Sequence, residues 1–123
     1  MKEDELLRLV SARGGLLAHL GTNDMRMIVK QIEEGDKHAE LIVSAMIWNV
    51  AKAIAAEGAV LCGKIDAVLL TGGLCYSDYI VNLLKKRIEF LAPVVVYPGQ
   101  DEMLALTENA IAALSGQREV FEY

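Results

Sequence analysis

The fold depends on one stretch of the sequence, Asp66-Ala67-Val68-Leu69-Leu70-Thr71-Gly72-Gly73-Leu74-Cys75-Tyr76-Ser77-Asp78. Residues 67–70 form an apolar run of strand length that ends in Thr71 and two glycines, and a helical pattern begins at Tyr79 and Ile80. Adjacent glycines let a ligand approach the backbone closely, and the N–H groups at a helix start favour an anion. The stretch therefore predicts a strand, a tight turn and a helix N-terminus. This corner is either an anion or nucleotide site or a connection without a ligand.

The residues that follow predict a helix and a second strand. Apolar side chains recur at helical spacing over residues 80–91, and Pro93 ends the pattern. Residues 94–97 are β-branched and apolar on both faces, which is typical of an interior parallel strand. The two strands and the helix between them therefore predict a βαβ unit, the core of an α/β fold with two parallel strands.

Glycine-containing turns follow both predicted strands. Gly72-Gly73 follows the first and Pro98-Gly99 the second. Both turns should meet at the carboxyl edge of the sheet, where open α/β sheets bind ligands. Asp101 and Glu102 then open a final helix that should end near Ser115. Acidic residues at a helix start usually complement the helix dipole.

Helices should fill the N-terminal half of the chain. Residues 2–12 form a short amphipathic pattern, whereas the sequence of residues 16–20 leaves their state open. Good capping residues precede a helix over about 24–34, and Asp36 caps a longer helix that ends near residue 61. Nearly the whole circumference of this longer helix is apolar, so most of it should be covered by protein.

Composition and charge exclude several classes of protein. The 123 residues, 54% of them hydrophobic, suffice for one domain with a real core. A net charge of −5 and the lack of a basic run argue against nucleic-acid binding. Charged residues interrupt the apolar region over residues 41–61, which favours a buried helix over a membrane span. The acidic N-terminus is unlike a signal peptide, and Cys62 and Cys75 lack metal-ligand spacing, so we expect reduced thiols in a cytoplasmic protein.

Three motifs together resemble the acetokinase family. Residues 21–26 (GTNDMR), 66–77 and 94–103 (VVVYPGQDEM) keep the order and spacing of that family, and the similarity covers about residues 5–115. The resemblance is to the C-terminal third of the family, in particular of its butyrate-phosphorylating members. It implies that residues 1–123 are a single partial domain of the actin-like and hexokinase-like (ribonuclease H-like) kinase fold.

The resemblance also implies a reaction and a set of ligands. Members of this family transfer a phosphoryl group from ATP to a short-chain carboxylate such as butyrate, which yields an acyl phosphate and ADP with the help of Mg²⁺. An acid at Asp101 or Glu102 would help to position Mg²⁺, and we prefer Glu102, because carboxylate oxygens are ligands that Mg²⁺ takes directly or through water. The residues that the resemblance assigns to ATP or ADP are Asn23, Asp24, Arg26, Thr71, Gly72, Gly73 and Leu74.

The chemistry of Asp24 and Arg26 agrees with this assignment. A carboxylate accepts hydrogen bonds from ribose hydroxyls or from a base amine, and a planar guanidinium stacks on adenine or pairs with a phosphate. Their positions at a helix start let both side chains project from the first turn. The alternative is a capping Asp24 beside a solvated Arg26.

The departures from the family pattern limit the expected activity. The first domain of the family, with its phosphate-binding turn and the Arg and His that stabilise the transferred group, has no counterpart in this sequence, and neither His19 nor His38 stands in a catalytic context. We therefore assign no catalytic residue and expect no kinase activity from this chain alone. A sheet of two secure strands has an exposed edge. We expect a homodimer, or a second chain that supplies the missing N-terminal domain.

Three functions remain in competition. The first is the nucleotide-binding C-terminal part of a carboxylate kinase. The second is a non-catalytic oligomerisation or interaction domain derived from such a kinase. The third is a small doubly wound protein that binds another phosphate at Gly72-Gly73.

Overall fold

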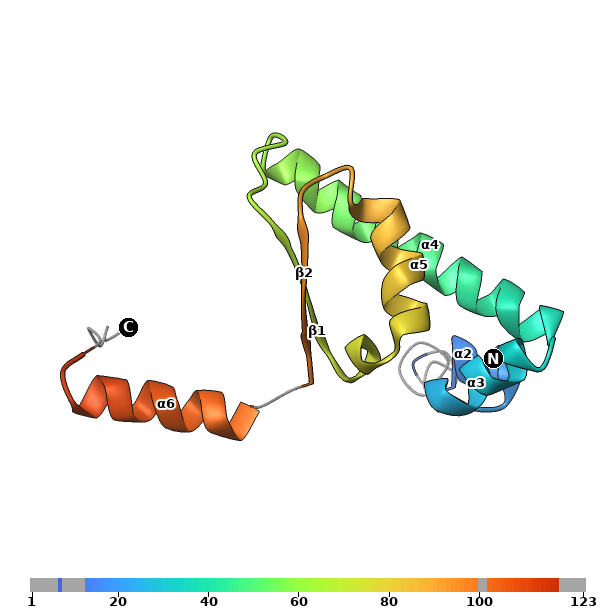
Figure 1. Ribbon diagram of the computed structural model, residues 1–123, viewed down its shortest axis with the longest axis horizontal. Coiled ribbons are helices and arrows are strands. Elements are labelled where there is room, and N and C mark those ends of the chain that lie inside the picture. Colours follow the sequence, from blue (N-terminus) through green and yellow to red (C-terminus); the bar gives the residue numbers. More distant parts are fainter. Residues whose placement is uncertain (1–6, 8–12, 100–101, 118–123) are drawn as a thin grey trace.

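The computed structural model describes residue 7, residues 13–99 and residues 102–117, with only the backbone for residues 102–104. The expected helix over residues 2–12 lies outside this part of the chain, apart from Leu7. The elements run in chain order (Figure 1): α2 (Leu16–Leu20), α3 (Met25–Glu33), α4 (Lys37–Val60), β1 (Val68–Gly72), the 3₁₀ helix η1 (Gly73–Tyr76), α5 (Asp78–Ile88), β2 (Val94–Pro98) and α6 (Glu102–Leu114).

The two strands form a parallel sheet, as the sequence predicts. Val68 lies opposite Val94, and the register continues to Gly72 opposite Pro98. Beyond the strands the two turns are joined, because the Gly72 N–H donates to the Gly99 carbonyl (3.1 Å) and the Gly99 N–H donates to the Gly72 carbonyl (3.2 Å). Both glycine turns therefore meet at one edge of the sheet.

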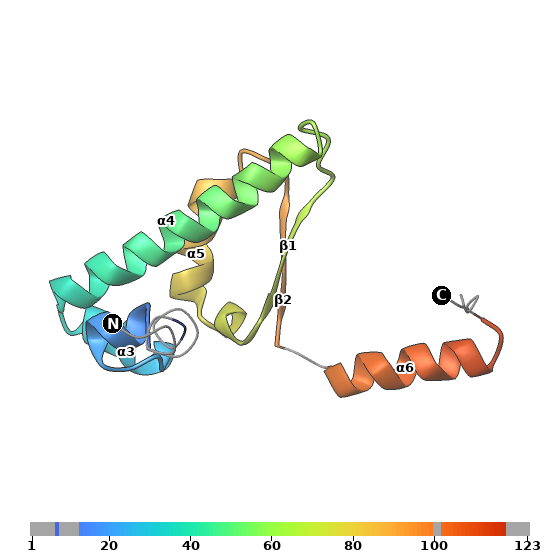
Figure 2. The same cartoon turned by 180° about the vertical axis from the view of Figure 1, so that it is seen from behind.

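The core lies between α4, α5 and one face of the sheet. Figure 1 and Figure 2 show α4 and α5 side by side on this face. Residues four apart on α4 form a buried stripe, and full burial of an aliphatic side chain of this size stabilises the fold by about 1.5–3 kcal/mol. The buried residues of this layer are Ala39, Val43, Ile47 and Ala51 of α4, Leu70 of β1, and Ile80, Leu84 and Ile88 of α5.

Most of α4 is less covered than the sequence suggests. Only 17% of its most apolar 18-residue stretch is buried. Leu41, Trp48 and Val60 are among its exposed side chains, and the Arg87 guanidinium lies 4.2 Å from the centre of the Trp48 ring. By length and composition α4 could cross a membrane, which is weak evidence for a span because core helices of soluble proteins meet the same criterion. Within the described residues, α4 is covered along one stripe.

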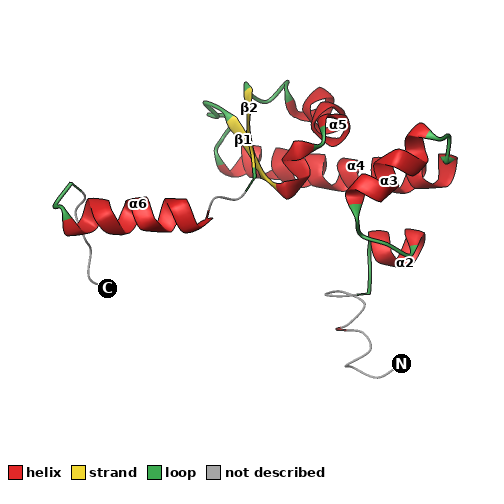
Figure 3. Cartoon of the chain, turned by 60° about the horizontal axis from the view of Figure 1, so that its bottom comes forward, coloured by secondary structure: helices red, strands yellow, loops and turns green. Residues whose placement is uncertain are grey.

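The second face of the sheet and α6 also lack cover among the described residues. Leu69, Val95 and Tyr97 are exposed on that face, whereas the composition of β2 suggests burial on both sides. The helix α6 lies apart from the other elements (Figure 1, Figure 3), and the side chains of residues 105–111 are all exposed.

The local signals in the sequence fix most element boundaries. Asp24 and Asp36 cap α3 and α4, and the left-handed Gly116 follows α6. Residues 16–20, which the sequence leaves open, form the short helix α2. The corner after β1 differs from the simple strand–turn–helix expectation, because η1 lies between the glycines and α5, and Ser77 caps α5.

Candidate functional site

A cleft of about 720 Å³ lies between α3 and the η1 segment. The two walls are about fifty residues apart in the sequence, and the packing of α3 and α5 on α4 brings them together. The volume of the cleft is in the range of small-molecule sites, which is about 300–1,000 Å³. The lining residues are Asn23, Asp24, Met25, Arg26, Val29, Lys30, Glu33, Gly73, Leu74, Tyr76 and Ser77.

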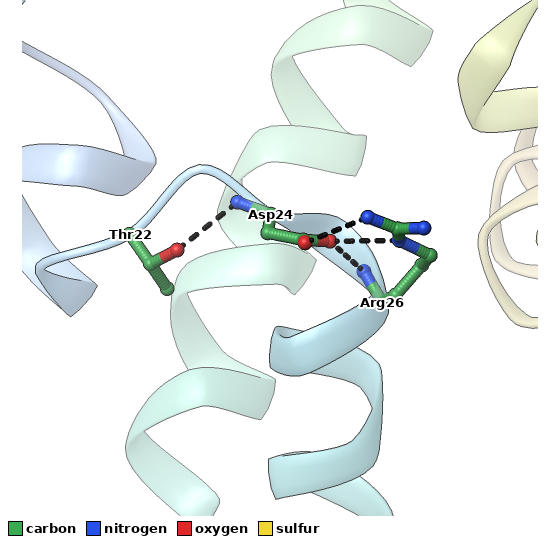
Figure 4. A network of polar contacts seen from close by, with 3 residues as sticks. All are labelled: Thr22, Asp24 and Arg26. Atoms are coloured by element: carbon green, nitrogen blue, oxygen red, sulfur yellow. Dashed lines mark hydrogen bonds and ion pairs between the residues drawn. The ribbon is translucent and has the colours of Figure 1, made fainter.

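The α3 wall is organised by the Asp24 carboxylate (Figure 4). Asp24 Oδ1 accepts a hydrogen bond from the Arg26 N–H (3.0 Å), and its own N–H donates to Thr22 Oγ1 (3.1 Å). The Arg26 side chain returns to the same carboxylate, with Nε donating to Oδ1 (3.2 Å) and Nη2 to Oδ2 (3.0 Å). These bonds from Arg26 lower the pKa of Asp24, and the carboxylate in turn raises the pKa of Arg26.

Arg26 remains accessible although it is paired. Its side chain is 92% exposed, so a ligand can reach the guanidinium without displacing packed residues. Exposed ion pairs contribute little to stability, typically about 0–1 kcal/mol. An incoming anion that binds Arg26 therefore competes with a weak interaction rather than a buried one.

The η1 wall presents open backbone to the cleft. A Cβ built on Gly73 would meet no atom within 4 Å, and Gly73 is exposed. Gly72 is buried, with a φ of 95° that favours glycine, and both of its backbone polar groups bond to Gly99. Thr71 Oγ1 also donates to the Gly99 carbonyl (3.2 Å). Thr71 and Gly72 thus hold the turn in place, and Gly73 faces the ligand space.

The structure brings five of the seven sequence-predicted nucleotide residues to this cleft: Asn23, Asp24, Arg26, Gly73 and Leu74. Thr71 and Gly72 lie directly behind them, as part of the turn. Asp101 and the side chain of Glu102 fall outside the described residues.

The sequence reasoning missed six lining residues. Val29, Lys30 and Glu33 follow Arg26 at intervals of three, four and seven, which places them on one face of α3, so helical periodicity could have identified them. Only tertiary packing could show that this face meets η1. The other lining residues that were not assigned to the ligand are Met25, Tyr76 and Ser77, which lie within the motifs at residues 21–26 and 66–77.

The charges of the cleft are mixed. Asp24 and Glu33 carry negative charge, whereas Arg26 and Lys30 carry positive charge. Such a set suits a ligand that has both hydroxyl donors and anionic groups. Within residues 7, 13–99 and 102–117 no group of three His, Cys, Asp or Glu side chains could hold a metal ion.

The two histidines lie elsewhere. His38 Nε2 donates to the His19 carbonyl oxygen (3.4 Å), which links the start of α4 to α2. Neither residue lines the cleft.

Comparison with known sequences adds evidence of ancestry. A profile of the acetokinase family matches residues 1–101. The chain is 61% identical over 121 residues to a probable butyrate kinase of Bacteroides thetaiotaomicron, which covers 98% of this chain and 34% of the relative. It is 42% identical over 121 residues to butyrate kinase 2 of Clostridium acetobutylicum, with coverage of 98% and 34%. For a probable butyrate kinase 2 of Caldanaerobacter subterraneus subsp. tengcongensis the identity is 46% over 114 residues, with coverage of 93% and 32%. The chain thus spans about a third of the length of these relatives.

Proposed function

The chain belongs to the acetokinase family, and we propose that it is the nucleotide-binding C-terminal part of a butyrate kinase-like enzyme. The proposed reaction of the whole enzyme converts ATP and butyrate into butyryl phosphate and ADP. The observation that supports this proposal most strongly is the shared cleft. Two motifs distant in sequence, at residues 23–26 and 73–77, form its opposite walls.

The cleft has suitable groups for each part of a nucleotide. Met25, Val29 and Leu74 supply apolar surface for a base. Asp24 accepts hydrogen bonds from ribose hydroxyls, and the guanidinium of Arg26 pairs with a phosphate or stacks on the base. The open backbone at Gly73 lets the ligand lie directly against the main chain.

We assign the magnesium of the reaction to the turn after β2. Gly99 is bonded to Gly72, so this turn starts beside the η1 wall. Glu102 is our first choice for the acid, with Asp101 as the second. Mg²⁺ commonly keeps several waters and takes one or two carboxylates together with the phosphates of its nucleotide. Bound there, the ion would neutralise charge on the transferred phosphoryl group.

The cleft alone does not supply a complete phosphoryl-transfer site. Catalysis of this reaction requires charged groups around the γ-phosphate from several sides. Arg26 and Lys30 provide positive charge from one wall only. We therefore propose that the chain is inactive by itself, and that the remaining part of an actin-like and hexokinase-like kinase, in the same polypeptide or in a second chain, completes the site in the cytoplasm.

An alternative function is supported by the uncovered apolar surfaces. Leu41 and Trp48 on α4, and Leu69 and Tyr97 on the sheet, are exposed. These surfaces suit a non-catalytic oligomerisation domain, including a homodimer. Light scattering that shows a stable dimer, combined with no response to millimolar ATP, would favour this function over a nucleotide module.

Calorimetric titration of the chain with ATP and Mg²⁺ tests the main proposal. We expect saturable binding that weakens about tenfold or more in Gly73→Val, because the added side chain fills the open space in the cleft, and that also weakens in Asp24→Ala.

Asp36→Ala is the matched control for Asp24→Ala. Asp36 also caps a helix, accepting from the His38 and Ala39 N–H groups at 2.9 and 3.0 Å, but it lies outside the cleft. The Asp36→Ala variant should bind ATP as the wild type does. Equal affinity in all four proteins, or no binding by the wild type, would refute the proposed site.

A further inference from the structure

Tyr76 is the one aromatic residue among the described residues that line the cleft. Tyr76 as a whole residue is 73% exposed. An exposed aromatic ring next to polar groups is a stacking surface for a planar ligand, and stacking accepts any base because every base has a π face.

The phenol end of Tyr76 lies against the turn after β2. A Cβ built on Gly99 would lie 2.5 Å from Tyr76 Oη and 3.2 Å from the adjacent ring carbon, so the phenol rests directly on the glycine. Gly99 is itself fixed by its two backbone hydrogen bonds to Gly72. This contact on one side limits the orientations that the ring can take, and a side chain with fewer orientations loses less conformational entropy when a ligand stacks on it.

The neighbours of Tyr76 in the cleft divide into two kinds. Met25, Val29 and Leu74 are apolar, whereas Asp24 and Arg26 offer charge and hydrogen bonds. A ligand with one flat apolar end and one polar anionic end would satisfy both sets. A nucleotide has this form.

We propose that Tyr76 is the base-stacking residue of the cleft, with the ribose and phosphates directed toward Asp24, Arg26 and Gly73. The inference rests on the proposed nucleotide site and adds the residue that makes the site prefer a nucleotide to a bare phosphate chain. Gly99 acts as a positioning residue, because it leaves the space that the phenol occupies.

The test compares ATP with inorganic tripolyphosphate, which has the phosphates without a base. Calorimetry is carried out on the whole chain with Mg²⁺. Tyr76→Leu should weaken ATP binding by about 5- to 150-fold, the range that corresponds to a base–aromatic stack, and should leave tripolyphosphate binding unchanged. Tyr76→Phe keeps the ring and should stay within about threefold of the wild type for ATP, a loss below 1 kcal/mol. Tyr97→Leu, which alters an exposed tyrosine outside the cleft, is the control.

A glycine pair tests the same claim without touching the lining of the cleft. Gly99→Ala should push the phenol away and weaken ATP binding. Gly35→Ala introduces a similar backbone strain, since φ is 101° at Gly35 and 98° at Gly99, but no atom lies within 4 Å of its added Cβ. The Gly35→Ala variant should bind ATP with the affinity of the wild type. This pair also decides the question if Tyr76→Leu does not fold.

The outcomes separate the inference from the proposed function. If the wild type binds ATP and Tyr76→Leu binds it equally well, the stacking role is wrong and the nucleotide site stands. An equal loss of ATP and tripolyphosphate binding would also overturn stacking, because the ring would then act on the shape of the cleft. A wild type that binds neither ligand would overturn the nucleotide site and the inference together.

Discussion

The two turns at the edge of the sheet begin alike and end differently. Each contains a glycine with a left-handed φ, 95° at Gly72 and 98° at Gly99, and the two glycines are hydrogen-bonded to each other. The turn after β1 leads into η1 and α5 and forms one wall of the cleft. The turn after β2 leads toward α6, whose side chains from residue 105 to residue 111 are exposed.

The difference lies in the helix that follows each turn. The helix α5 buries Ile80, Leu84 and Ile88 against α4 and the sheet, and this contact fixes the turn before it. The helix α6 also carries large apolar residues, among them Leu106 and Ile111, yet both are exposed. Among the described residues, the turn that leads into the packed helix α5 contributes to the lining of the cleft, and the turn that leads toward the exposed helix α6 does not. Since the chain spans about a third of its relatives' length, we propose that α6 is covered by a segment that corresponds to the other two thirds of those relatives.

The largest expected effect is on the free energy of unfolding, and it appears when one isoleucine of α5 is compared with one isoleucine of α6. Ile88 is fully buried and Ile111 is 59% exposed. Ile88→Ala should lower the free energy of unfolding by about 2–5 kcal/mol, through lost burial and the cavity left behind. Ile111→Ala should change it by no more than about 0.5 kcal/mol. Urea denaturation measures both, and a similar loss for the two variants would show that α6 is packed in solution.

A smaller effect on stability is expected when Gly99 and Gly73, which have different surroundings, are each replaced by alanine. Gly99→Ala places a methyl group against the Tyr76 phenol at a left-handed φ and should destabilise the fold by about 1–3 kcal/mol. Gly73→Ala places it in open space and should be neutral, or stabilising by about 0.4–1 kcal/mol. Thermal unfolding of the two variants gives the comparison. A destabilised Gly73→Ala would mean that the η1 backbone is less open than the structure shows.

The smallest effect concerns the α3 wall of the cleft and depends on pH. Hydrogen bonds from Arg26 lower the pKa of Asp24 below its ordinary value of 3.8. A carboxylate with a lowered pKa in the folded state stabilises the fold above its unfolded pKa, and this contribution is lost as the pH falls through the folded value. Wild type should therefore melt at a slightly higher temperature than Asp24→Asn at pH 7.

This difference in melting temperature should disappear as the pH falls below the lowered pKa. Melting curves from pH 7 down to about pH 2.5 follow it. A difference that persists unchanged at the lowest pH would mean that the carboxylate charge is not what stabilises this wall.

Local signals in the sequence predicted the elements well. Asp24 and Asp36 mark helix starts because their side chains accept from free N–H groups, and Pro93 and Gly116 mark ends for backbone reasons. The β-branched run after Pro93 predicted β2. The 3₁₀ helix at Gly73–Tyr76 was missed, because four residues carry too little periodicity to distinguish it from a turn.

The site was only partly predictable for a different reason. The capping of α3 by Asp24 is local and could be predicted, whereas the ion pair of Asp24 with Arg26 does not follow from helical spacing, because side chains two residues apart do not face each other on a helix. The place of Tyr76 depends on Gly99, which is 23 residues away and is brought close by the parallel register. A single sequence also gives no measure of how much of α4 is covered, since cover depends on whatever packs against it.

The most direct test of the proposed nucleotide cleft is a titration of the isotopically labelled chain with ATP and Mg²⁺, followed through the amide chemical shifts in NMR spectra. We predict that the largest saturable shifts occur together at residues 23–26 and 73–77, the two walls of the cleft. Saturable shifts confined to α4 or α6, with both walls unchanged, would contradict it.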